Sequence, residues 1–133
     1  MTRDEARRSM VAYWLTKADE ALVAADADLR GGHPSFGMNR AYYACFYAAS
    51  AVLLHEGRTF KRHHGVRDAV HTHFVNGGRL SPAQGRLYDR LFETQLRLDY
   101  AVFASIDPAE AHDLFRQAKD LAADLRNLIQ TAE

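Results

Sequence analysis

Cysteine, proline and tryptophan are scarce in this chain of 133 residues, which contains one, three and one of them. The single cysteine, Cys45, has no partner for an intramolecular disulfide, and a lone thiol fits a reducing compartment. The first residues, Met1 to Glu5, contain no apolar signal region, so we expect a cytoplasmic protein. The longest mostly apolar run, Ala41 to Leu54 with Ser50 as its one polar residue, is shorter than the roughly 20 residues that a membrane span needs. These absences argue against a disulfide-rich secreted protein and against a membrane protein.

The chain also lacks a net charge. Lysine plus arginine total 17, aspartate plus glutamate total 17, and the formal net charge is +0. No global field therefore draws the protein onto nucleic acid or an anionic membrane. The charge is locally uneven, because the segment from Glu56 to Arg67 carries several cations against one acid, with His63 and His64 among them.

Residue patterns for metal and phosphate sites are missing as well. His71-x-His73 would place its two rings about 200° apart on a helix, unlike the one-sided histidine pair of a zinc helix. The glycine pairs Gly31-Gly32 and Gly77-Gly78 follow helical segments and indicate helix stops rather than phosphate-binding loops. The sequence therefore predicts no metal site and no cofactor.

Helical periodicity extends over nearly the whole chain. Apolar residues recur at steps of three and four, and no segment has the apolar–polar alternation and turn residues of a hairpin. Capping residues and helix stops divide the chain into segments. The expected helices begin near Thr2, Pro34, Gly65, Ser81 and Asp107, and the first three end near Arg30, Glu56 and Val75. We predict one all-α domain over residues 1–133, an up-and-down helical bundle of four long helices plus one short helix.

The expected second helix is the most informative segment. From Ala41 to Leu54 it is apolar on all sides and must therefore be buried on all sides. One face, which includes Cys45, can pack in the core, where a lone cysteine is usually a small apolar residue rather than a nucleophile. The other face has no evident partner inside a small bundle, so either the short helix or a second protomer covers it. We predict a homodimer whose interface includes Ala44, Tyr47 and Ala51.

The same helix carries a group of aromatic residues, Tyr42, Tyr43, Phe46 and Tyr47. Such rings could form a platform on which nucleic acid bases stack. Aromatic packing in the protein core explains the same pattern. The sequence leaves both interpretations open.

Three sequence blocks resemble the small stand-alone HEPN proteins (higher eukaryote and prokaryote nucleotide-binding domain). They are Asn39-Arg40-Ala41-Tyr42-Tyr43-Ala44, His63-x-Gly65-Val66 and Arg97-Leu98-Asp99-Tyr100. That family carries similar blocks, in this order, on its second helix, at the entry to its third and on its fourth. The resemblance implies an up-and-down helical bundle that usually dimerises. Its candidate ligand-binding residues are Arg40, Tyr43, His63, Arg97, Asp99 and Tyr100.

The resemblance implies one of two kinds of function. Some HEPN proteins are metal-independent ribonucleases with an Arg-x(4–6)-His motif at the dimer interface, where the arginine holds the phosphate and the histidine moves protons. Others are the helical partner of a minimal nucleotidyltransferase, often in toxin–antitoxin pairs, or bind nucleotides without cleaving them.

The ribonuclease motif is not found at the expected place in this chain. Arginine–histidine pairs with the required spacing occur about as often as chance predicts, and none lies on the expected fourth helix. After Arg97 no histidine occurs until His112, beyond the break at Asp107. We therefore expect a nucleotide- or RNA-associated partner of a minimal nucleotidyltransferase encoded nearby, with no assigned catalytic residue. The alternatives are a metal-independent ribonuclease toxin and a non-catalytic dimeric scaffold.

Arg97 and Asp99 allow two interpretations. Asp99 shares a helical face with apolar residues and would need a polar partner if it is partly buried. Arg40 or Arg97 could form an ion pair or hydrogen bond with it and tie the second and fourth helices together. Alternatively, Arg40, Tyr43, Arg97 and Tyr100 could line a polar pocket that faces a phosphate or a base.

Overall fold

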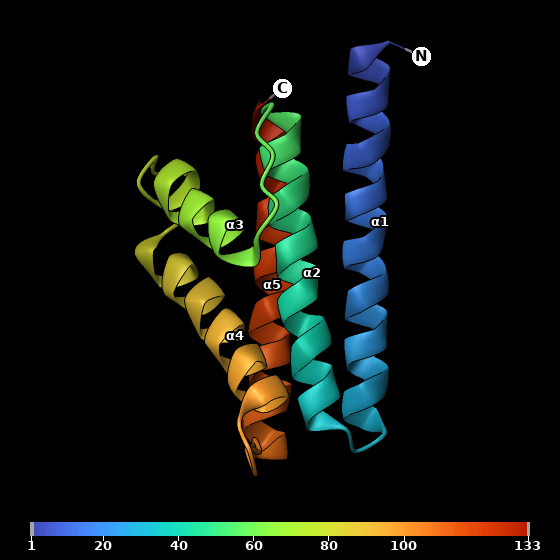
Figure 1. Cartoon of the computed structure of the whole chain (residues 1–133), viewed down its shortest axis with the longest axis vertical. Coiled ribbons are helices and arrows are strands. Elements are labelled where there is room, and N and C mark those ends of the chain that lie inside the picture. Colours follow the sequence, from blue (N-terminus) through green and yellow to red (C-terminus); the bar gives the residue numbers. More distant parts are fainter. Residues whose placement is uncertain (1, 133) are drawn as a thin grey trace.

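The structure is a computed structural model and describes residues 2–132. In chain order the helices are α1 (Arg3–Arg30), α2 (Pro34–His55), α3 (His63–Ala69), the π-helix η1 (Val70–Val75), α4 (Pro82–Tyr100) and α5 (Pro108–Ala132). These residues contain no strand, which confirms the all-α prediction. None of the helices that they form is both long and apolar enough to cross a membrane. Figure 1 shows α1, α2 and α5 along the long axis, with α3 and α4 as an inclined pair on one side.

The capping residues mark the helix starts as predicted. Thr2 Oγ1 accepts the backbone amide of Glu5 at 3.1 Å, and Glu5 Oε2 accepts the amide of Thr2 at 3.3 Å. Ser81 and Gln84 form the same reciprocal pair at the start of α4, at 3.1 and 2.8 Å. Each pair satisfies amides that the first helical turn leaves without an intrahelical partner.

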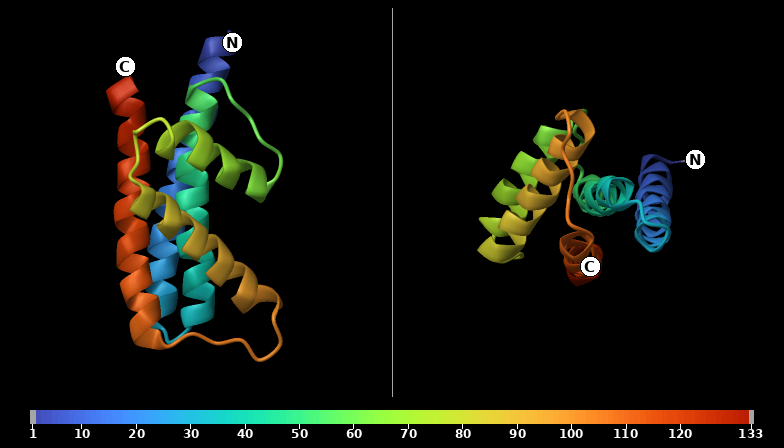
Figure 2. Two further views of the ribbon diagram at one scale, coloured as in Figure 1. Left: turned by 90° about the vertical axis from the view of Figure 1, so that its left-hand side faces the viewer. Right: turned by 90° about the horizontal axis from the view of Figure 1, so that it is seen from below.

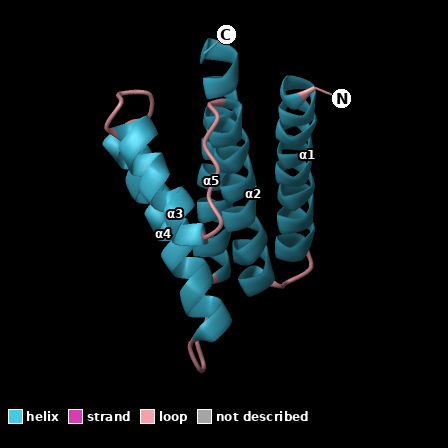
Figure 3. Ribbon diagram, turned by 45° about the horizontal axis from the view of Figure 1, so that its top comes forward, coloured by secondary structure: helices cyan, strands magenta, loops and turns pink. Residues whose placement is uncertain are grey.

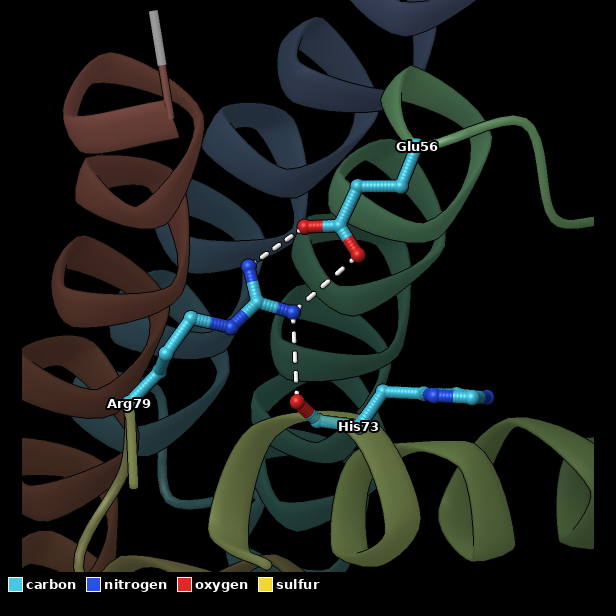
Figure 4. Close-up of polar contacts among 3 residues, drawn as sticks. All are labelled: Glu56, His73 and Arg79. Atoms are coloured by element: carbon cyan, nitrogen blue, oxygen red, sulfur yellow. Dashed lines mark hydrogen bonds and ion pairs between the residues drawn. The ribbon is translucent and has the colours of Figure 1, made fainter. Parts of the chain in front are cut away.

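The short third helix begins at His63, ahead of the predicted start at Gly65, and continues into η1. Figure 4 shows the contacts that hold the end of η1. Arg79 donates to both carboxylate oxygens of Glu56, at 2.5 and 3.1 Å, and to the carbonyl oxygen of His73 at 3.2 Å. The hydrogen bonds from Arg79 hold the pKa of the Glu56 carboxyl below its ordinary value. One guanidinium thus joins the end of α2, the end of η1 and the turn before α4.

Helix α2 lies at the centre of the bundle, with α1 and α5 on two sides and α3 and α4 on a third (Figure 2). Its core face is fully buried and includes Cys45. The Cys45 thiol donates to the carbonyl oxygen of Ala118 in α5 at 3.3 Å, and burial raises the pKa of Cys45 to about 12. A buried thiol that stays protonated is a core residue rather than a nucleophile.

Helix α1 covers the face of α2 for which the sequence offered no partner. Trp14 of α1 stacks on Tyr47 with 5.5 Å between ring centroids. On the same face Ala44 and Ala51 are fully buried within a single chain. The prediction that these two alanines meet a second protomer is therefore corrected, because a side chain without exposed surface cannot contact another molecule. Tyr47 is only half-buried, and the homodimer itself stays a prediction.

Candidate functional site

A continuous row of half-buried rings lies on α2 between α1 and the start of α3. We call it the aromatic strip, and its members are Trp14, Tyr43, Phe46, Tyr47 and His63. Beyond the Trp14–Tyr47 stack, the Tyr43 ring lies 5.6 Å from Tyr47 and 5.3 Å from His63. Phe46 stacks on His63 with 4.3 Å between centroids and an interplanar angle of 10°. The strip is therefore ordered by its own ring contacts while each ring keeps exposed surface.

His63 is fixed in the strip by a hydrogen bond from the core. The hydroxyl of Tyr42 lies 2.9 Å from His63 Nδ1. Burial raises the pKa of Tyr42, so this hydroxyl keeps its proton, and we assign it as the donor to Nδ1. Burial also lowers the pKa of His63, so the ring is neutral near pH 7 and its proton is assigned to Nε2. Within residues 2–132 that Nε2 makes no hydrogen bond, which leaves it available to a ligand.

The lowered pKa of His63 predicts a pH dependence of stability. The unfolded chain, with an ordinary histidine pKa near 6.5, binds a proton more readily than the folded chain. The free energy of unfolding is therefore expected to fall as the pH decreases from about 7 towards the folded-state pKa of His63. Urea unfolding followed by circular dichroism at pH 7.5 and pH 5.5 measures this.

The His63→Phe variant should show a smaller decrease over the same interval, because the titrating ring is gone while an aromatic ring remains. The matched control is His112→Gln, since His112 is exposed on α5. Equal decreases in wild type and His63→Phe would contradict the assignment to His63.

A polar cluster joins α2 to α4 beside the strip. Asp99 Oδ2 accepts hydrogen bonds from Asn39 Nδ2 at 3.0 Å and from Gln95 Nε2 at 2.5 Å. Gln95 keeps only 6% of its surface exposed, whereas Asp99 is exposed. A hydrogen bond between the second and fourth helices was one of the two predicted roles for Asp99. Its partners are carboxamides, however, and neither of the predicted arginines.

The two candidate arginines are engaged elsewhere. Arg40 Nε lies 3.2 Å from Asp28 Oδ2 of α1, although the Arg40 side chain is still about half exposed. Arg97 donates through Nη1 to the carbonyl oxygen of Ser105 at 3.0 Å, in the loop that follows α4. The sequence could not reveal these partners, because Asp28 and Ser105 reach the two arginines only through the course of α1 and of that loop.

Four of the six candidate ligand residues lie together. Tyr43 contacts the ring of His63, and its pKa is raised by burial first and then by the nearby Tyr47, Tyr100 and Asp99. Tyr100 and Asp99 are therefore close enough to Tyr43 to contribute to the raised pKa of its hydroxyl. Arg40 borders the strip from the side of α1, and Arg97 is turned towards the following loop. Among residues 2–132, no three side chains that ligate metals gather at one place.

Two grooves border the aromatic strip. The polar groove, between α1 and α2, has a volume of about 480 Å³ and includes Lys17, Asn39, Arg40 and Tyr43. The apolar groove, of about 450 Å³, lies between α1, the second half of α2 and the segment 56–62 that leads to α3. Figure 3 shows this segment running from the end of α2 to the start of α3. A flat ligand on the strip would thus have cations within reach on the polar side.

Several residues of this site were not predicted from the sequence. Asn39 and Gln95 hold Asp99, and Arg67 lies over the ring of Phe92 at 4.6 Å. Asn39 opens the first of the three blocks that resemble the family, and Gln95 lies one helical turn before Asp99, but neither was predicted to hold that carboxylate. Trp14 had no such signal, because it comes from another helix.

Comparison with known proteins matches residues 11–128 to the HEPN domain family. A UPF0332 protein of Thermotoga maritima is 32% identical over 124 residues, which cover 93% of this chain and 94% of that protein. A protein of Methanocaldococcus jannaschii named "Putative toxin MJ0605" is 36% identical over 83 residues, 62% of each chain. A UPF0332 protein of Pyrococcus horikoshii is 40% identical over 60 residues, 45% of this chain and 42% of that protein.

Proposed function

Because this chain belongs to the HEPN domain family, we propose that it binds nucleotide or RNA as one member of a toxin–antitoxin-type pair, without cleaving its ligand. Its partner in the pair is a minimal nucleotidyltransferase encoded by a neighbouring gene. The relative that carries a toxin name supports the toxin–antitoxin context. The observation that carries the binding proposal is the aromatic strip with the polar groove beside it.

The strip has the chemistry that binds unpaired bases. Bases stack on aromatic side chains regardless of sequence, and cations beside the rings hold the phosphates. Tyr43 and His63 offer ring surface, and Lys17 and Arg40 supply positive charge along the polar groove. Glu20 also lines this groove, so the net attraction is modest. We therefore expect an affinity that falls with added salt.

The proposal of binding without cleavage depends on Arg97. A ribonuclease of this family would use an arginine to hold the phosphate and a histidine shortly after it to move protons. Arg97 instead donates to the Ser105 carbonyl, and the next histidine along the chain, His112, lies on α5. His63 is the histidine of the aromatic strip, and it comes from a different helix than Arg97.

A fluorescence titration tests the binding. Trp14 is the single tryptophan of the chain and stacks within the strip, so a short single-stranded RNA is expected to quench its emission. Tyr43→Ala should weaken binding about tenfold, because stacking contributes about 1–3 kcal/mol per base. The control Phe36→Ala removes an exposed ring outside the strip and should bind as wild type does. Equal affinity for wild type and Tyr43→Ala would contradict binding at the strip.

The same RNA, incubated with the protein and a chelator, should remain intact. Cleavage that produces cyclic 2′,3′-phosphate ends would favour the second candidate function, a metal-independent ribonuclease toxin. The observation that favours this candidate is the unbonded Nε2 of His63, so such cleavage should be lost in His63→Gln. Co-purification with the nucleotidyltransferase from the adjacent reading frame tests the proposed pair. A lack of association between the two proteins would overturn the proposed partnership.

A further inference from the structure

We propose that the apolar groove binds an amphipathic anion, a free fatty acid of medium chain length. The acyl chain lies along the groove, and the carboxylate meets the basic segment 57–64 at its edge. This inference does not depend on the proposed function, because such a ligand contains neither a base nor a phosphate.

The groove has the size and lining of a site for a small apolar ligand. Its volume of about 450 Å³ falls within the roughly 300–1,000 Å³ of small-molecule sites, whose walls are mainly apolar and aromatic side chains. Met10 and Trp14 of α1, Leu53 and Leu54 of α2, and Phe60 supply such walls. Met10 and Phe60 are 44% and 41% exposed, so a ligand that covers them removes apolar surface from water.

The groove is elongated along α2. Its lining from this helix begins at Phe46 and ends at Leu54, two turns that span about 12 Å at a rise of about 1.5 Å per residue. Helix α1 runs alongside, and the segment 56–62 bows outward from the end of α2 before it reaches α3 (Figure 2). This shape suits an unbranched chain, whereas the neighbouring aromatic strip suits flat rings.

The end of α2 places cations at the edge of the groove. Gly57 has φ of 81°, and its amide donates to the carbonyl oxygen of Leu54 at 2.9 Å. The amide of Arg58 donates to the carbonyl oxygen of Leu53 at 2.8 Å. These two bonds form the motif that ends a helix at glycine, so they fix the backbone position of Arg58. The guanidinium of Arg7 lies 3.8 Å from the position that a Cβ on Gly57 would take.

The cations that line the groove are available to an anion. Arg58 and Lys61 are both exposed, and within residues 2–132 neither side chain forms an ion pair. The segment from Gly57 to His64 contains no acid, and no acid of the described chain lines the groove. A guanidinium and an ammonium beside an apolar groove match a ligand that joins an apolar chain to a carboxylate.

The nearby acids do not cancel this positive charge. Arg58 contributes to the lowered pKa of Glu56, but both carboxylate oxygens of Glu56 accept hydrogen bonds from Arg79. Asp4 and Glu5, in the first turn of α1, do not line the groove. The carboxylate of Glu5 is also engaged in the capping pair at the start of that helix.

Equilibrium dialysis with labelled decanoate, below the concentration at which it forms micelles, tests the inference. Saturable binding to the wild type is expected. The emission of Trp14 should shift to shorter wavelength, because the chain displaces water from a ring that lines the groove. The affinity should rise about fourfold for each methylene group from octanoate to decanoate, as expected for a buried chain. A lack of saturable binding would overturn the proposal.

A charge reversal separates the carboxylate from the chain. The double variant Arg58→Glu, Lys61→Glu should bind decanoate at least about fivefold more weakly, the effect of losing one exposed ion pair. Its affinity for decanol, which has the same chain length and no charge, should equal that of the wild type. Unchanged decanoate binding in the double variant would contradict the assigned role of the two cations.

Met10→Glu tests the position of the chain. It places a carboxylate on the apolar wall and should abolish decanoate binding, while the circular dichroism spectrum stays helical because Met10 is partly exposed. The control Val23→Glu adds the same charge to α1 at a residue that is 71% exposed outside both grooves, and it should bind as the wild type does. Decanoate binding that survives Met10→Glu would overturn the groove as the site.

Two other occupants would give different results. If decanoate does not bind but the protein sediments with anionic phospholipid vesicles and Met10→Glu does not, the groove faces a lipid surface. If decanoate does not bind and Met10→Glu instead dissociates a dimer of the wild type, a second copy covers the groove. Either result would overturn the proposal of a free fatty acid.

Discussion

Replacing Tyr42 with alanine is expected to lower the free energy of unfolding by about 3–5 kcal/mol, the range for removing a buried aromatic side chain. Tyr42 is fully buried and its ring contacts the rings of Tyr88 and Phe92, at 6.1 and 5.6 Å between centroids. The lost stability has two contributions. The apolar surface of the ring is no longer buried, and its removal leaves an unfilled cavity between α2 and α4. Urea unfolding followed by circular dichroism measures it.

Tyr42→Phe separates the ring from the hydroxyl. This variant keeps the packing of the ring and loses the hydrogen bond to His63 together with the contact to the buried Tyr88 hydroxyl, so it should cost about 1 kcal/mol or more. The pKa of His63, measured by NMR titration, should rise in Tyr42→Phe, because the lost donor had stabilised the neutral ring. An unchanged His63 titration together with full stability would show that the hydroxyl does not hold the histidine.

Replacing Ala51 with glutamate is expected to abolish folding rather than only dissociate a dimer. Ala51 is fully buried, and a carboxylate there would be unpaired and would cost several kcal/mol in a domain whose total stability is about 5–15 kcal/mol. The far-ultraviolet circular dichroism signal should fall, and the single tryptophan Trp14 should become exposed to solvent. Val23→Glu is the control, since exposed substitutions stay within about 0.5 kcal/mol.

An Ala51→Glu variant that stayed helical would contradict the packing of α1 on α2. The outcome thus decides which surface of α2 can be studied by mutation. Substitutions at Ala44 or Ala51 report on the fold, whereas those at Tyr43 report on a surface that a single chain leaves partly open.

Local signals in the sequence predicted the helices well. The reciprocal pairs Thr2–Glu5 and Ser81–Gln84 lie within one turn, so their residue types and spacing suffice to place a helix start. The burial of Cys45 also followed from the uniformly apolar character of its helix. The start of the third helix was placed too late, because Arg62 at its N-cap has no side chain that marks a helix start.

Contacts between distant segments were not predictable in the same way. The sequence placed Asp99 at a junction of two helices but could not choose its partner, because that depends on the angle at which α4 crosses α2. The bond between Tyr42 and His63 depends on where the segment 56–62 returns to α2, and no local pattern encodes that path. The burial of Ala51 within a single chain likewise depends on the packing of α1 along α2, which the sequence does not specify locally.

The burial of Cys45 has a practical consequence for following this protein in solution. Its thiol has no exposed surface and a raised pKa, so maleimide and iodoacetamide reagents should not reach it while the bundle is closed. The native chain therefore behaves towards such reagents as if it contained no cysteine. A single cysteine introduced at an exposed position would take a dye or spin label at that site alone, and distances between two labelled copies could be measured without first altering the core.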